Sequence, residues 1–189
     1  MAAFSVADSL DDIRIAFETY SNTSTFFMAG QQSSTPYYSV ARFLPTIPQG
    51  STILTAFMTL VCSNASSGTA VLTNLYLEDV DDAARIASFA DYADRVTRPW
   101  TAAVPWDNIG AWTLAASYDT PSLVVPIQTV VNRALWASGQ GMNVYWVNDG
   151  SDDGACRFGS SQDSATYTEP VLTVTWTPPA STRRIFVVS

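Results

Sequence analysis

Short segments in which apolar and polar residues alternate, separated by glycine and proline, run along most of the chain. Ile13, Ile15 and Phe17 alternate with Arg14, Ala16 and Glu18, and this period of two is typical of a strand that buries one face. Similar patterns, bounded by turn residues, predict further strands. The candidate strands are 13–18, 23–28, 37–44, 53–62, 71–77, 112–118, 142–147, 155–160 and 171–177.

Two segments depart from simple alternation. Residues 53–62 are apolar on both faces, which predicts a central strand covered on both sides. Residues 121–133 form the one segment with a helical period, in which Leu123, Ile127 and Val130 recur at helical spacing. Asp119 before Pro121 supplies a cap and a proline in the first turn. The pattern therefore predicts one short helix within a β-rich chain.

Length and composition support an all-β fold. The chain has 189 residues with 47% hydrophobic side chains, enough for the core of one domain. It contains no Lys and few Glu, so strong helix formers are scarce. Pro178 and Pro179 end the last predicted strand. We therefore expect a single β-sandwich over residues 1–177 and a C-terminal extension over 178–189.

The charged residues exclude several mechanisms. All nine basic residues are Arg and there is no His, which excludes a Ser-His-Asp triad, an imidazole metal ligand and a lysine Schiff base. The net charge of -8 argues against a nucleic-acid partner, because phosphate binding needs a clustered basic face. The most apolar segment, 53–62, is too short to span a membrane as a helix. We expect no enzymatic activity, no nucleic-acid partner and no membrane partner.

Several segments, in order, resemble one family. They are ARFLPTIPQGSTILTAFMTL, LYLEDVDDA, RVTRPWTAAVPWDNIGAW, the long segment from SYDTPSLVVPIQTVVNRALW to VYWVNDGS, and EPVLTVTW. Together they resemble the DNRLRE-type β-sandwich domain found in secreted, wall-associated and phage-borne bacterial proteins. The resemblance covers about residues 14–176 and implies a jelly-roll β-sandwich with one short helix. The six-letter motif behind the family's name is absent, and the family implies no single activity.

Three tryptophans form the first candidate site. Trp100, Trp106 and Trp112 recur within one proline-containing segment. Exposed together, they would form a platform on which sugar rings stack; buried, they would close one end of the sandwich. The matching aromatic positions of the family favour burial.

Acidic residues offer two weaker candidates. In NDGSDDGA, Asp149, Ser151 and Asp153 match the first half of a calcium loop, although the Asp-Gly pairs also favour a hairpin turn. The run Glu78, Asp79, Asp81 and Asp82 fails as a calcium loop and is expected to be a solvated acidic loop partly neutralised by Arg85. We expect no cofactor beyond this calcium candidate.

The cysteines and the C-terminus leave alternatives open. Cys62 and Cys156 fit either two buried thiols or a disulfide. The tail carries two cations and then four apolar residues, which suits pairing with the sheet edge of a neighbour better than exposure to solvent. The residues expected to contact a partner are Arg183, Arg184, Ile185, Phe186, Val187 and Val188.

These features favour a structural role. The N-terminus lacks the apolar run of an exported leader, so an extracellular-type sandwich is expected to assemble in a host cytoplasm. A phage virion protein fits, above all a capsid decoration (cement) protein that contacts the major capsid protein and its own copies as a homo-oligomer. The alternative is a carbohydrate-binding module, or a tail or head-fibre adhesin domain that binds cell-surface glycans, with an extracellular location.

Overall fold

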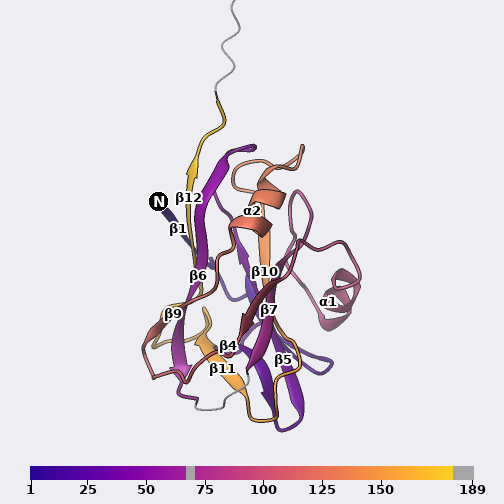
Figure 1. The fold of residues 1–189 in the computed structure, drawn as a ribbon. Helices are drawn as coiled ribbons and strands as arrows, with labels where there is room; N and C mark the ends of the chain where they lie inside the picture. The colour runs from indigo at the N-terminus through magenta and orange to yellow at the C-terminus, as the bar shows by residue number, and fades with distance from the viewer. Residues whose placement is uncertain (67–70, 181–189) are drawn as a thin grey trace, which may run out of the picture.

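The protein is mostly β-strand, as Figure 1 shows. The computed structural model describes residues 1–66 and 71–180. The strands and helices are β1 (Ala2–Ser5), β2 (Asp12–Ala16), β3 (Thr19–Ser21), β4 (Phe26–Gln32), β5 (Thr35–Phe43), β6 (Thr52–Asn64), β7 (Leu72–Leu77), α1 (Phe89–Arg95), β8 (Val104–Asp107), β9 (Ser117–Asp119), α2 (Val124–Val131), β10 (Met142–Asn148), β11 (Cys156–Ser160) and β12 (Val171–Thr177). The prediction of an all-β fold is confirmed.

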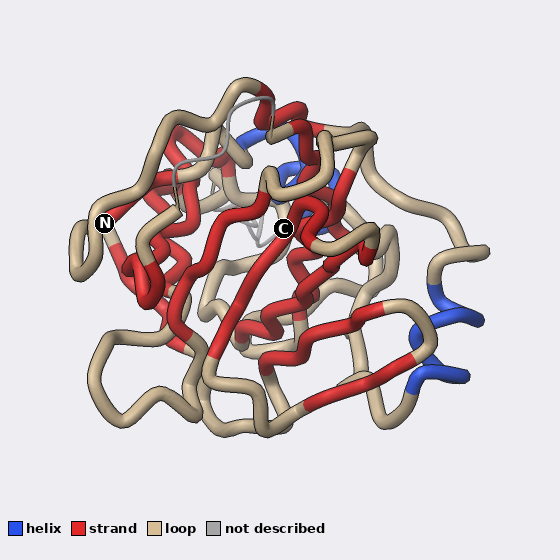
Figure 2. The backbone as a smooth tube through the Cα atoms, turned by 90° about the horizontal axis from the view of Figure 1, so that it is seen from below, coloured by secondary structure: helices blue, strands red, loops and turns tan. Residues whose placement is uncertain are grey.

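The strands form one antiparallel sheet that curls into a sandwich-like shape. Its order is β1-β12-β6-β11-β4-β5-β10-β7-β8, while β2 and β3 extend from β5 and β9 pairs with β6. The long strand β6 links the two layers, because Thr52–Thr59 pair with β12 whereas Cys62 and Asn64 pair with β11. Figure 2 shows strands around a central space, with one helix standing outside them.

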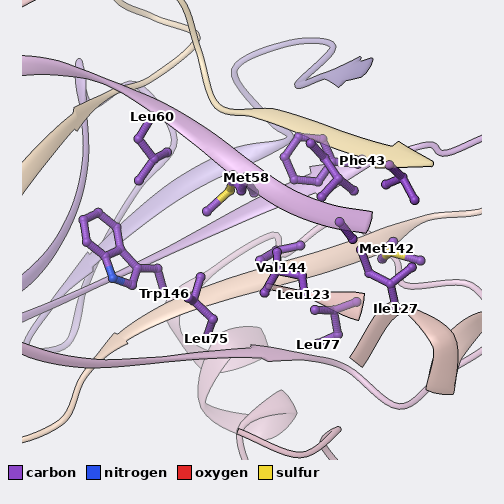
Figure 3. Packing of buried hydrophobic residues seen from close by; sticks show 14 of the residues in the cluster. Phe43, Met58, Leu60, Leu75, Leu77, Leu123, Ile127, Met142, Val144 and Trp146 are labelled. Atoms are coloured by element: carbon purple, nitrogen blue, oxygen red, sulfur yellow. The ribbon is translucent and has the colours of Figure 1, made fainter. Parts of the chain in front are cut away.

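The core fills the space between the layers and is closed by α2. In Figure 3, Met58 and Leu60 from β6 lie near Val144 and Trp146 from β10, with Leu123 and Ile127 at the start and middle of α2. Trp146 is fully buried, and its indole Nε1 donates a hydrogen bond of 2.9 Å to Thr73 Oγ1. This bond satisfies the one polar group that the indole brings into the core.

Strand β10 is covered on both sides, whereas 53–62 is not. In β6, Ala56, Met58 and Leu60 are buried, but Leu54 on the other face is 55% exposed. In β10, Trp146 faces the central core, while its neighbour Tyr145 belongs to a second apolar cluster on the outer face. The second cluster exists because α1 and the chain around it cover that face.

The helices also differ from the prediction. The structure has two helices, and α2 begins at Val124 rather than at Pro121. Thr120 explains the later start: its N donates to Met58 O and its Oγ1 accepts from Met58 N, so 119–120 are tied to β6 instead of capping the helix. The other helix, α1, has seven residues, too few for a helical period to stand out. Strands β1, β3 and β8 were also not predicted.

The core position of Trp112 gives a stability prediction. Its side chain is 3% exposed and its ring stacks on that of Tyr118 at 4.5 Å. We expect Trp112→Ala to lower the free energy of unfolding by about 3–5 kcal/mol, measured by urea denaturation. Leu114→Ala, at a site 49% exposed, is the control and should change it by about 0.5 kcal/mol at most. Equal losses in the two variants would contradict the burial of Trp112.

Candidate functional site

An open groove of about 620 Å³ lies on the outer face of the sheet, beside α1. Six of its ten lining residues are aromatic, a composition typical of ligand sites. The lining consists of Phe17, Tyr38, Tyr76, Phe89, Tyr92, Ala93, Val96, Trp100, Val147 and Asn148.

The floor of the groove comes from adjacent strands. Tyr38 of β5 is directly opposite Val147 of β10, and Tyr145 of β10 is opposite Tyr76 of β7. Residues two apart on a strand share a face, so Tyr145 and Val147 both point outward, away from the buried Trp146. The alternation of each strand therefore places this row of side chains outside the sandwich.

The wall comes from α1 and the segment after it. Phe89, Tyr92 and Val96 follow the helical spacing i, i+3 and i+7, which sets them on one face. Ser88 caps the helix, because its Oγ accepts a hydrogen bond of 3.1 Å from Asp91 N. Beyond the helix, the ring of Trp100 lies 5.1 Å from that of Tyr76, edge to face.

A buried ion pair fastens this wall to the sheet. Arg95 near the end of α1 donates from Nη1 to both oxygens of Glu78 at 3.2 Å, and from Nε to Asp91 Oδ1 at 2.8 Å. Glu78 Oε1 also accepts from Asn143 Nδ2 at 2.9 Å and from the Tyr145 hydroxyl. Burial and the neighbouring Glu78 charge raise the pKa of Tyr145, so this phenol stays protonated as a donor.

The groove also presents polar groups without a protein partner. Among the described residues, no hydrogen bond involves the hydroxyls of Tyr38, Tyr76 or Tyr92, or Nδ2 of Asn148. Asn148 Oδ1 is engaged, since it accepts from Ser151 N at 3.1 Å. Burial raises the pKa of all three tyrosines. They are therefore neutral phenols that can donate and accept hydrogen bonds.

Of the two alternatives for the three tryptophans, the favoured burial holds for Trp112, and the platform of all three is not formed. Trp100 lines the groove, but Trp112 is buried in the central core and Trp106 packs against that core. The rings of Trp106 and Trp112 lie 6.0 Å apart and each lies close to Trp146. The reason is that 104–107 form edge strand β8, which turns Trp106 inward. Of the three tryptophans, Trp100 is the one in the groove lining. The tyrosines of the groove, Tyr38, Tyr76 and Tyr92, were not predicted as site residues.

The acidic run is not a solvated loop neutralised by Arg85. Glu78 is buried, Asp79 and Asp81 pair with Arg133 at 2.6 and 2.9 Å, and Asp82 Oδ1 accepts from Gly141 N at 2.7 Å. Arg85 instead pairs with Asp8 and with Asp11. The run therefore joins the β7 end to the chain after α2.

The candidate calcium residues lie in the turn between β10 and β11, where each already has a protein partner. Asp149 Oδ2 accepts from Asn74 Nδ2 at 2.7 Å, and Asp153 Oδ1 accepts from Ser34 N at 2.7 Å. Ser151 is buried, and its Oγ exchanges two hydrogen bonds of 2.9 Å with the backbone of Leu72. These contacts tie the turn to β7 and to the turn between β4 and β5. Calcium binding here stays a prediction.

Cys62 and Cys156 are buried free thiols, not a disulfide, and burial raises the pKa of Cys156 to about 12. Such a thiol is unreactive at neutral pH. The expected partner contacts at 183–188 lie outside the described residues.

The comparison with known proteins identifies no family. No family model matches the chain, and no curated protein is significantly similar to it. The resemblance to the DNRLRE-type domain therefore stays a prediction. Across residues 1–66 and 71–180, neither helix is long and apolar enough to cross a membrane.

Removing the buried carboxylate should release the wall of the groove. We expect Glu78→Gln to lower the free energy of unfolding by about 3–5 kcal/mol, because Arg95 loses its buried partner. Asp94→Asn, which breaks the exposed pair with Arg98, is the control and should cost about 1 kcal/mol or less. Urea denaturation and amide hydrogen exchange in α1 measure both. Similar costs for the two variants would show that the Glu78 contact does not hold α1.

A second buried acid, Asp12, makes stability depend on pH. It is 2% exposed, and its Oδ1 has no hydrogen-bond partner among the described residues. Burial raises its pKa to about 7. The hydrogen bond from Gln162 N lowers this pKa, while the negative charges of Asp163, Asp11 and Glu169 add to the increase. Since an unfolded Asp loses its proton near pH 4, the folded state binds more protons between those values.

The free energy of unfolding should therefore fall as the pH rises from about 4 to about 7. Asp12→Asn cannot ionise and keeps an acceptor for Gln162, so we expect it to melt at a higher temperature than the wild type at pH 8. At pH 4 the two should melt alike. Thermal melts across this range measure the effect, and parallel curves for the two proteins would contradict it.

Proposed function

We propose that this chain is a non-enzymatic binding domain that holds a neutral saccharide in the aromatic groove. The observation that carries the proposal is the combination of six aromatic side chains with three unpartnered phenol hydroxyls and the Asn148 amide. A sugar presents apolar C–H faces, which pack on aromatic rings, and hydroxyls at its rim, which need donors and acceptors. The groove offers both kinds of contact within one surface.

The charge of the groove favours a neutral ligand over an anionic one. Among residues 1–66 and 71–180, no Arg belongs to the lining. Arg95, beneath it, is fully engaged: Glu78, Asp91 and the carbonyl oxygens of Ala84 and Arg85 accept its hydrogen bonds. A carboxylate or phosphate in the groove would find no cation to offset its loss of water.

The same residues support binding without catalysis. Glycoside hydrolysis commonly needs two carboxyl groups that flank the scissile bond. In the part of the chain that the structure describes, no Asp or Glu lines the groove. The nearby Glu78 is held by Arg95, Asn143 and Tyr145 beneath the surface. A bound sugar would therefore meet rings, hydroxyls and an amide.

The biological setting follows from the family resemblance. A tail or head-fibre adhesin of a phage virion would carry such a groove toward cell-surface glycans, and the groove favours this role over capsid decoration. Decoration of the major capsid protein, with homo-oligomer contacts through Arg183 to Val188, stays a second proposal that rests on the sequence alone.

Removal of single hydroxyls tests the groove. On a glycan array we expect neutral glycans to bind, and we expect Tyr38→Phe and Tyr76→Phe each to weaken the best one about 2- to 10-fold. This range corresponds to one hydrogen bond of about 0.5–1.5 kcal/mol. Melting temperatures should not fall, because these hydroxyls have no protein partner.

Tyr20→Phe is the matched control. The Tyr20 hydroxyl donates to Ile86 O at 2.9 Å and lies outside the groove lining, so its loss should lower stability and leave affinity unchanged. Absence of binding to every neutral glycan would overturn the proposal.

A further inference from the structure

Phe17 occupies an unusual position at the rim of the groove. It is the first residue of the two-residue turn between β2 and β3. The strand pair Ala16–Thr19 closes this turn. Its φ is 50°, in the left-handed region where glycine or asparagine is favoured and a bulky side chain is strained. The ring is nevertheless 60% exposed to solvent. The fold therefore places a large apolar ring in a strained turn without burying it.

The ring continues the outward row of its strand. Ile13 and Ile15 point to the outer face and are buried in the second apolar cluster, and Phe17, in the turn after them, lines the groove on the same face. Unlike Phe89 or Tyr92, it takes part in none of the aromatic contacts among the described residues. Strained, exposed residues of this kind are found at ligand-binding positions.

Phe17 and Trp100 belong to opposite sides of the groove. Phe17 follows β2, whereas Trp100 forms a bridge with Glu78 at the end of β7 and lies against Tyr76 and Tyr145. The strands between β2 and β7 are β5 and β10. The floor thus spans three strand spacings, about 14 Å in all, which is wider than a single sugar ring.

We propose that Phe17 forms the second stacking position of this groove, so that its ligand is a saccharide of at least two units. One unit stacks on Trp100 and another on Phe17, and the hydroxyls of Tyr38, Tyr76 and Tyr92 bond the rims of the rings between them. This inference rests on the proposed function and extends it to the length of the ligand.

The test measures affinity against ligand length by NMR titration. The probes are three series: glucose, maltose and maltotriose; glucose, cellobiose and cellotriose; N-acetylglucosamine, chitobiose and chitotriose. In at least one series, we expect wild-type affinity to rise about tenfold from monomer to trimer. Phe17→Asn, which suits the left-handed conformation, should lose most of that increase. Its melting temperature should not fall.

Two variants serve as controls. Phe17→Tyr keeps a ring and should keep the increase with length, while Ser33→Gly relieves another left-handed residue, at φ 51°, outside the groove lining and should leave affinity unchanged. An increase that persists in Phe17→Asn would overturn the role of Phe17 and leave saccharide binding intact. No binding of any series by the wild type would overturn both proposals.

Discussion

The buried ion pair between Arg95 and Glu78 is the interaction on which the outer face of this protein depends. Moving both charges out of water is costly, and the cost is offset only when every remaining donor and acceptor is bonded. Glu78 meets that condition through Asn143 and Tyr145, and Arg95 through Asp91 and two backbone carbonyls. The geometry of α1, and with it the wall of the groove, is thereby fixed against the sheet.

The pair also explains how the sheet supports the second apolar cluster outside the central core. The central core lies between the layers and is closed by α2, as in many β-sandwiches. The second cluster forms only where α1, Ile86 and Trp100 cover Ile15, Val40 and Tyr145 on the outside. This cover stops at the row of Tyr38, Tyr76 and Val147, and the groove is the part of the outer face left open.

Much of the fold could be predicted from the chain, because strands that bury one face show a period of two. The predicted segments 37–44, 142–147 and 171–177 nearly coincide with β5, β10 and β12. The site could not be predicted in the same way. Its residues come from the turn after β2, from β5, β7, β10 and α1, and from the segment after α1. Neither the seven residues of α1 nor the pairing of Glu78 with Arg95 leaves a local pattern. One signal was available: Tyr145 and Trp146 are adjacent large rings, which a strand must bury on opposite faces.

Four of the six tryptophans lie in two separate regions of the molecule. Trp106, Trp112 and Trp146 have ring centroids 5.4–6.0 Å apart, close enough for their electronic transitions to couple. The coupled signal of that trio in near-ultraviolet circular dichroism therefore reports the integrity of the central core. Trp100 stands apart from the trio, on the outer face against Tyr76 and Tyr145, so its share of the tryptophan emission reports the state of the groove.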